Sequence, residues 1–280
     1  MLKLFTVLLL GLFLMAGPAH AQPKCALVAG GSRGIGYAIA EALAKRGWNL
    51  ILVARHPDDL AKAKTQLEAT YPVHVDVLAK DLSQEATAAE LAAWCEEHKV
   101  SLRMLCNVAG IGGARDYLQL PADSVRYMMR LNLESEVMLT DALLPLLERN
   151  PRAYILNVAS MAGLAPIPGK NIYSATKSAV IFFSYSLRYQ LRRKHISVSC
   201  LAPGPVYTKP EVINTTHQTL GKWFGDWMEV PPARVGEVAV RKTLKGKMLI
   251  VPGTLANLSS KLIRVLPRRW AAAIYARGNN

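Results

Sequence analysis

The sequence predicts a single doubly wound α/β domain, in which a seven-stranded parallel sheet is covered by helices on both faces. The chain has 280 residues, enough to bury the core of one large α/β domain. Short apolar or β-branched runs bounded by Gly, Asn or Asp alternate with longer segments of helical periodicity. Parallel strands separated by helices need right-handed crossovers, which place helices on both faces of the sheet.

Seven segments are expected to be strands: Cys25–Ala29, Leu50–Ala54, Val73–Leu78, Met104–Asn107, Ala153–Val158, Ser197–Leu201 and Met248–Val251. Sheets of this kind bind their ligands at the carboxyl ends of the strands, near the point where the strand order reverses. The residues that directly follow these strands are therefore the first candidates for a site.

A glycine-rich turn follows the first predicted strand, and a helix is expected from about Ile35. The candidate contacts with a dinucleotide in this turn are Gly30, Ser32, Arg33, Gly34, Ile35 and Gly36. Glycines at this spacing permit a tight turn and let backbone N–H groups approach a pyrophosphate at a helix N-terminus. The same pattern also occurs in ordinary strand-to-helix turns, but its place directly after a strand favours a cofactor site.

The end of the second predicted strand indicates which dinucleotide is bound. It reads Val53-Ala54-Arg55-His56, without an acid before Asp58. An acid here would accept the ribose 2′-hydroxyl of NAD and repel the 2′-phosphate of NADP. Arg55 and Arg33 instead offer two guanidinium groups that can pair with a phosphate. We therefore expect NADP(H) as cofactor; the alternative is that both arginines are merely exposed.

Tyr173 and Lys177 are candidates for proton transfer. They are four residues apart at the start of a predicted helix that runs to about Lys194, so the phenol and the ammonium share one face. A tyrosine is a poor acid or base at neutral pH, but a nearby cation favours its phenolate form. A Tyr-x-x-x-Lys pair alone is common by chance.

Two further polar residues strengthen this interpretation. Ser160 ends the fifth predicted strand, 13 residues before Tyr173, so strand end and helix start can converge on one carbonyl oxygen. Asn132 is a polar residue in an otherwise apolar helical stretch. Taken singly, Ser160 fits a turn residue and Asn132 a satisfied core amide.

From about residue 24 to 252 the chain resembles the short-chain dehydrogenase/reductase family. The resemblance rests on an ordered set of motifs: Gly30, Gly34 and Gly36, Asp81-Leu82, Asn107-Val108-Ala109-Gly110, Asn132, Ser160, Tyr173 with Lys177, and Pro203-Gly204 leading to Thr208. It implies a Rossmann-type domain, expected at residues 22–254, and an enzyme active on CH–OH donors. All four catalytic positions are filled, which disfavours the alternative of a catalytically silent, NADP-binding regulatory or membrane-surface protein.

The resemblance also implies residue roles. Tyr173 is the general acid/base, Lys177 assists it and holds the nicotinamide ribose, Ser160 orients the carbonyl, and Asn132 supports a water relay. The remaining cofactor contacts that it implies are Asp81, Leu82, Asn107, Ala109, Gly110, Pro203, Gly204, Val206 and Thr208. Val108 departs from the second Asn that is common in the family, which puts one loop hydrogen bond in doubt.

The expected substrate is an apolar carbonyl compound. Residues 209–230 carry Trp223, Phe224, Trp227 and Met228, where a lid over the substrate would lie. The chain is also loosely similar to reductases of lipid-like ketones, which favours a 3-oxoacyl or steroid-like ketone. Carrier-linked 3-oxoacyl reductase and small-ketone reductase stay open as alternatives, and the aromatic residues also fit core packing.

Residues 1–21 are typical of a signal peptide or a membrane anchor. A basic start precedes the apolar run Leu4–Ala16, and Ala19-His20-Ala21 suits a signal peptidase. The run is shorter than the roughly 20 residues that span a bilayer as a helix, so cleavage fits better than a permanent span. Export or membrane association is expected, with a cytoplasmic enzyme as the alternative.

The formal charge of +14 is unevenly distributed. Residues 241–280 hold nine of the basic residues and no acid, and the extension 255–280 mixes them with apolar residues. This pattern suits a membrane surface or a wall of the substrate pocket, as well as a merely solvated face. No nucleic-acid motif accompanies it, and the four cysteines lack metal-site spacing, so neither nucleic acid nor metal is expected. The family resemblance also suggests homo-oligomers.

Overall fold

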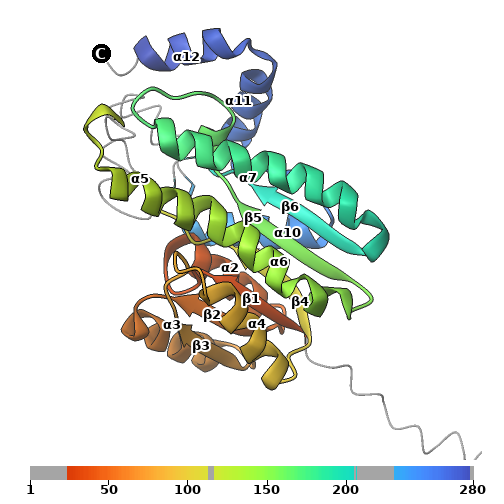
Figure 1. Cartoon of the computed structure of the whole chain (residues 1–280). Coiled ribbons are helices and arrows are strands. Elements are labelled where there is room, and N and C mark those ends of the chain that lie inside the picture. Colours follow the sequence, from red (N-terminus) through yellow and green to blue (C-terminus); the bar gives the residue numbers. More distant parts are fainter. Residues whose placement is uncertain (1–23, 113–116, 205, 207–229, 278–280) are drawn as a thin grey trace, which may run out of the picture.

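The computed structural model describes residues 24–112, 117–204, 206 and 230–277 (Figure 1). It confirms the doubly wound fold, with one parallel sheet in the order β3-β2-β1-β4-β5-β6-β7. The strands are β1 (Cys25–Ala29), β2 (Asn49–Ala54), β3 (Val75–Ala79), β4 (Leu102–Asn107), β5 (Ala153–Val158), β6 (Ile196–Leu201) and β7 (Leu249–Ile250). β3 begins two residues later than predicted, because the amide of Val73 turns back to the carbonyl of Tyr71 at 2.8 Å.

Helices connect and cover these strands. They are α2 (Gly34–Ala44), α3 (Pro57–Thr70), α4 (Thr87–Glu97), α5 (Ala122–Met129), α6 (Ser135–Glu148), α7 (Asn171–Gln190), α10 (Pro232–Leu244), α11 (Thr254–Val265) and α12 (Arg268–Arg277). A π-helical turn, Arg130–Glu134, joins α5 to α6. α7 ends earlier than predicted, and its last residues form the 3₁₀ turn Leu191–Lys194.

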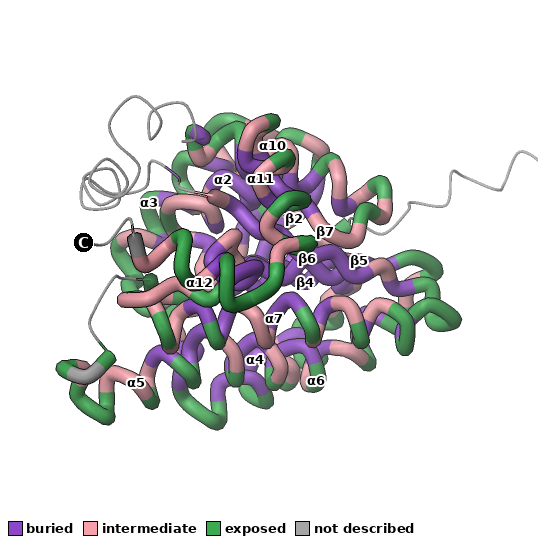
Figure 2. Tube along the Cα trace, turned by 90° about the horizontal axis from the view of Figure 1, so that it is seen from above, coloured by how far each residue is buried: buried purple, intermediate pink, exposed green. Residues whose placement is uncertain are grey.

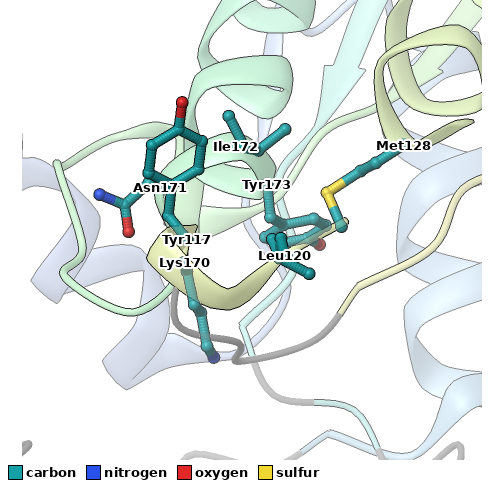
Figure 3. A pocket seen from close by; sticks show the side chains of 7 residues that line it. All are labelled: Tyr117, Leu120, Met128, Lys170, Asn171, Ile172 and Tyr173. Atoms are coloured by element: carbon teal, nitrogen blue, oxygen red, sulfur yellow. The ribbon is translucent and has the colours of Figure 1, made fainter. Parts of the chain in front are cut away.

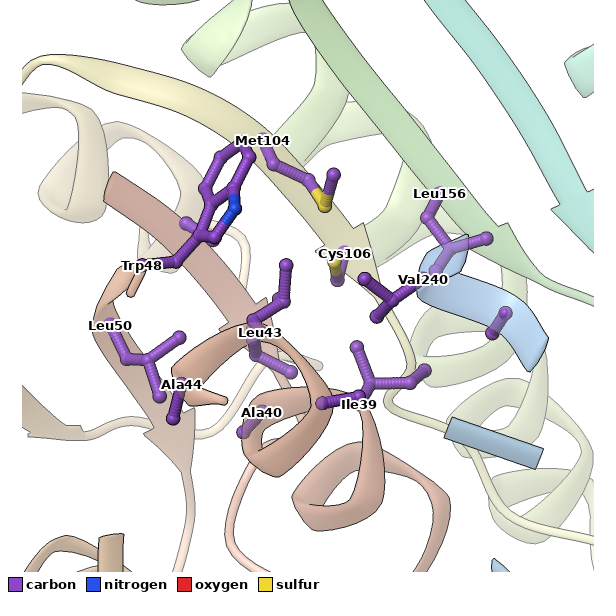
Figure 4. Close-up of a cluster of buried hydrophobic side chains, with 14 of the residues drawn as sticks. Ile39, Ala40, Leu43, Ala44, Trp48, Leu50, Met104, Cys106, Leu156 and Val240 are labelled. Carbon is purple, nitrogen blue, oxygen red and sulfur yellow. The ribbon is translucent and has the colours of Figure 1, made fainter. Parts of the chain in front are cut away.

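The two faces of the sheet bury separate apolar clusters, because successive side chains of a strand point in opposite directions. Ala26 and Val28 of β1 face α2, α3 and α10, whereas Leu27 and Ala29 face α4 and α6. Figure 4 shows the first cluster, in which Leu43 of α2 lies among strand side chains. Both faces are apolar, as a sheet covered on each side requires.

α2 and α10 pack closely on the first face. A Cβ at Gly236 of α10 would lie 2.2 Å from the carbonyl oxygen of Ala38, so the helices meet backbone to backbone. At the end of this contact, Arg46 and Glu237 form an ion pair. α10 is therefore fixed against the helix that follows the glycine turn.

Strand register brings the predicted site segments to one edge. Ala29 pairs with Val53 and Asn107, Asn107 pairs with Asn157, and Val158 with Leu201. The segments that follow these residues therefore lie side by side, on either side of the reversal between β1 and β4.

The cysteines are free thiols, and three of them are buried. Burial raises the pKa of the Cys95 and Cys200 thiols to about 12, so they stay protonated and pack as small apolar groups. No group of metal-ligating side chains occurs in the described ranges.

Several expectations concern residues outside the described ranges. These are the leader at 1–21, Thr208, and the lid at 209–230 except Val230. Within the part of the chain that is described, no helix is both long and apolar enough to cross a membrane.

Candidate active site

The glycine turn forms a cradle at the end of β1. Gly30 has a φ of +88° and its amide donates to the carbonyl of Val53 at 2.7 Å. A Cβ at Gly36 would lie 1.9 Å from the Gly30 carbonyl oxygen, so no side chain fits there. Ser32 and Ile35 are half-buried beside this turn.

The cradle fits the pyrophosphate of a dinucleotide. α2 begins at Gly34, the second left-handed glycine of the turn, and its N-cap residue Arg33 makes no side-chain cap hydrogen bond. The amides of the first turn are thus available to an anion, which a helix N-terminus attracts.

The two arginines predicted to read the 2′-phosphate lie at this edge with different partners. Arg33 is exposed, and its Nη1 is 3.9 Å from Asp59, an exposed pair that contributes little energy. Arg55 follows β2, donates a hydrogen bond to the Tyr127 hydroxyl and lies over its ring. Neither contact is buried, so both guanidinium groups can turn to a ligand phosphate at low cost.

Asp81 caps the turn after β3. Its Oδ1 accepts hydrogen bonds from the amide and the hydroxyl of Ser83, at 2.9 and 2.8 Å. Leu82 is buried beside it. The contact of Asp81 with an adenine stays a prediction.

Asn107 points into the interior instead of lining the edge. It is only 3% exposed, and its Nδ2 donates to Thr140 Oγ1 and Asn157 Oδ1, both at 3.1 Å. The next two residues lie at the edge of the sheet instead. The amides of Val108 and Ala109 both donate to the carbonyl of Ala29, which holds this segment beside the end of β1. A Cβ at Gly30 would lie 2.8 Å from the Ala109 amide nitrogen, so the two segments touch.

Asn132 fixes the loop after β4. Its side chain is fully buried in the π-helical turn, accepts from the amide of Ile111 and donates to the Ile111 carbonyl, both at 2.8 Å. A Cβ at Gly110 would lie 3.1 Å from Asn132 Oδ1 and 3.4 Å from Lys177 Nζ. Asn132 therefore holds this loop next to the Lys177 ammonium.

Ser160 and the Lys177 ammonium both lie at the end of β5. Lys177 is only 3% exposed, and its Nζ donates to the Val158 carbonyl at 2.7 Å. Ser160 Oγ accepts from the amide of Ala162 at 3.1 Å, so the hydroxyl hydrogen is free to be donated elsewhere. A Cβ at Gly163 would lie 2.6 Å from the Lys177 backbone, which places the segment after Ser160 directly on α7.

Tyr173 lies one turn before Lys177 on α7 and lines a pocket (Figure 3). The pocket is mostly apolar, and the side chains that line it are Tyr117, Leu120, Met128, Lys170, Asn171, Ile172 and Tyr173. Lys170 is the one ammonium among them, and burial lowers its pKa. The cavity is small, about 10 Å³, and Tyr173 forms part of its wall.

Pro203 and Gly204 follow β6 at the same edge of the sheet. The amide of Met161 donates to the Pro203 carbonyl at 3.0 Å, and a Cβ at Gly204 would lie 3.3 Å from the Met161 sulfur. Val206 is buried and forms an isolated bridge with Val230. This segment therefore borders the one that carries Ser160.

Glu136 is a buried acid that the sequence analysis missed. It is 3% exposed on α6, and its Oε1 has no hydrogen-bond partner among the described residues. Burial raises the pKa of this carboxyl to about 8, opposed by the charge of Lys177. The signal in the sequence is its spacing, four residues after Asn132.

Comparisons with known proteins agree with this geometry. A family model described as short chain dehydrogenase matches residues 24–218. Sulfoacetaldehyde reductase from Chromohalobacter salexigens is 35% identical over 258 residues, covering 90% of this chain and 97% of that protein. The 3-oxoacyl-[acyl-carrier-protein] reductase of Bos taurus is 30% identical over 237 residues, covering 83% of this chain and 98% of that protein.

A solved structure is similar over the same extent. L-sorbose reductase from Gluconobacter frateurii, complexed with NADPH and L-sorbose, matches with a TM-score of 0.72 and 25% sequence identity. The match covers 83% of this chain and 97% of that one. Each of the three relatives therefore corresponds to most of the chain.

Proposed function

The chain belongs to the short-chain dehydrogenase family of oxidoreductases, and from that premise we propose the reaction that it catalyses. It is an NADP(H)-dependent transfer of hydride between nicotinamide and the carbonyl or secondary alcohol of an apolar substrate, such as a 3-oxoacyl or steroid-like ketone. The observation that carries this proposal is the buried Lys177 ammonium bound at the end of β5, where Ser160 follows, with Tyr173 one turn away on α7.

The chain's own residues handle the proton and the oxygen. A bound nicotinamide supplies the hydride. Tyr173 donates its hydroxyl proton to the carbonyl oxygen, and the Ser160 hydroxyl donates a hydrogen bond to the same oxygen as negative charge develops. Lys177, held by the Val158 carbonyl, stabilises the phenolate that Tyr173 becomes.

NADP preference rests on Arg33 and Arg55 at the edge of β1 and β2. Exchange of Arg55 for Asp places a carboxylate where the 2′-phosphate would lie, so we expect Arg55→Asp to shift the preference towards NAD. The measurement is the ratio of NADPH to NADH affinity by calorimetric titration. An unchanged ratio would show that Arg55 does not read the phosphate.

The apolar lining by Leu120, Met128 and Ile172 supports an apolar substrate. Lys170 supports a second candidate, a small anionic aldehyde, because its ammonium is an anion site within the pocket. The relative named sulfoacetaldehyde reductase is consistent with this alternative. Lys170→Met separates the two, since it should raise the KM of an anionic aldehyde and leave that of an apolar ketone nearly unchanged.

The deciding experiment titrates the protein with NADPH and then NADH, followed by a panel of apolar ketones and anionic aldehydes. Turnover is read from the reduced-nicotinamide absorbance. Tyr173→Phe is the matched variant, because it removes the transferable proton and keeps the ring. We expect NADPH binding to persist and turnover to fall about a thousandfold or more. Retained turnover in this variant would refute the mechanism, and absence of binding of either cofactor would refute the reaction.

A further inference from the structure

The two C-terminal helices bury several small side chains and expose several large apolar ones. Ala256, Ser260 and Ala271 are each about 1% exposed and face the protein. The outward residues of this surface, which we call the α11–α12 face, are Leu258, Leu262, Val265, Trp270 and Ile274, with exposures between 55% and 78%. A helix that served only the core would have the opposite arrangement.

Within each helix, the exposed apolar residues follow helical spacing, so they lie on one side of that helix. Leu258, Leu262 and Val265 lie four and three residues apart on α11, and Trp270 and Ile274 four apart on α12. They are half of the large apolar side chains recorded as exposed in the described residues. Figure 1 shows α11 and α12 at the same end of the molecule, and in Figure 2, which is seen from above, α12 is coloured mostly as exposed or intermediate.

The charges around this face have one sign. Exposed cations flank the apolar residues on both helices, namely Lys261, Arg264, Arg268 and Arg269. The last acid of the chain is Glu237, and none of these four cations forms an ion pair within the described residues. A face with apolar side chains, a tryptophan and only cations matches the interface of an anionic bilayer in both polarity and charge.

We propose that the α11–α12 face docks the protein on an anionic lipid bilayer, with α11 and α12 lying in the interface plane. A second copy of the chain is the competing occupant, and the charges disfavour it. A twofold contact would place the same cations of each copy against those of the other, without an acid between them. Lipid phosphates would instead neutralise them.

The face adjoins the active site. Arg268 of α12 donates to the carbonyl of Leu164, which lies between Ser160 and Tyr173 in the chain. On α11, Ala256 lies against Gly204, since a Cβ at Gly204 would be 3.8 Å from the Ala256 Cβ. Docking would therefore hold the substrate side of the site next to the bilayer, from which an apolar ketone could enter. Only this last step depends on the proposed function.

Co-sedimentation of the full chain with vesicles tests the docking. The probes are phosphatidylglycerol vesicles and phosphatidylcholine vesicles, at low and high salt. The test variant is Leu262→Glu/Ile274→Glu. The control, Phe182→Glu/Tyr189→Glu, changes two exposed apolar residues of α7 to the same charge. Both retain residues 1–21, so any binding by that segment is common to all proteins.

We expect the wild type and the control to bind phosphatidylglycerol at least about tenfold more tightly than phosphatidylcholine, and salt to weaken the binding. The test variant should lose about tenfold or more of this affinity, because it places carboxylates in the apolar interface. Equal binding of the test variant and the control would overturn the proposal. Sedimentation velocity without lipid gives a second test. A dimer that is lost only in the test variant would also overturn the proposal, since the face would then bind a second copy.

Quenching by brominated phosphatidylglycerol locates the contact. Quenching of the tryptophan emission should be larger in the wild type than in Trp270→Phe, because Trp270 would reach the acyl chains. Equal quenching would place Trp270 outside the bilayer and overturn the docking geometry. Cofactor affinity, measured in the same variants without lipid, monitors folding, so failure of docking is distinguishable from failure of the proposed reaction.

Discussion

Helices α2 and α11 are both amphipathic, but they differ in the size of the side chains that they bury completely against the protein. α2 buries Ile39 and Leu43, both fully inaccessible, against the sheet and α10. α11 buries Ala256 and Ser260 and leaves Leu262 60% exposed. The comparison teaches that an apolar stripe specifies that a helix has a partner but does not identify the partner.

The largest effect should come from shortening a side chain on the buried face of α2. Leu43→Ala should reduce the free energy of unfolding by about 3 kcal/mol, because the strand side chains around Leu43 cannot close the cavity. Urea unfolding followed by circular dichroism measures this. A loss below about 1 kcal/mol would mean that α2 is no better packed than α11.

A smaller but sizeable loss is expected at the contact between α2 and α10. Gly236→Ala should cost about 2 kcal/mol, since the new methyl would overlap the Ala38 carbonyl and push the helices apart. The control is Arg234→Ala, an exposed change on the same helix. Equal unfolding midpoints for the two variants would contradict the close approach.

α6 is an exception to the apolar inner face, because it buries Glu136. The pKa of this carboxyl rises from 4.5 to about 8 on folding, so the folded protein binds more protons between these pH values. The contribution of Glu136 to the free energy of unfolding is therefore fully present below about pH 4.5, and it is lost as the pH rises towards 8.

Glu136→Gln should therefore change how stability depends on pH. At pH about 9 the variant should be more stable than the wild type by about 1–3 kcal/mol, because the wild type must bury a carboxylate, and at pH about 5 the two should be similar. Urea unfolding at both pH values measures this, with the exposed Glu97→Gln as control. A parallel pH dependence in wild type and variant would contradict a neutral buried acid.

The smallest expected effect on stability, at Leu262 of α11, is the most direct test of the difference between α2 and α11. Leu262→Ala on α11 should change the free energy of unfolding by less than about 0.5 kcal/mol, because the side chain is already in water. The same urea assay as for Leu43→Ala gives a direct pair. A loss approaching that of Leu43→Ala would show that α11 packs its apolar side chains on the protein.

The sequence predicted the sheet well because its signals are local. Apolar runs, helical periodicity and the glycine turn each lie within a few residues, so the seven strands were found within two residues of their bounds. That Tyr173 and Lys177 share one side of a helix was predicted in the same way, from helical spacing, and both lie on α7. The direction of Asn107 was not predicted, because it depends on Thr140 and Asn157, which are far away in the sequence.

The sequence by itself determined the order of strands and helices along the chain and the glycine turn after β1. It also determined which residue types are available for proton transfer. Only the tertiary structure decided that Glu136 is buried near Lys177, that Asn132 holds Ile111, and that Leu258, Leu262 and Val265 of α11 face outward. The physical reason is that burial and contact across the fold depend on which elements pack together. Spacing along one helix or strand cannot specify that packing.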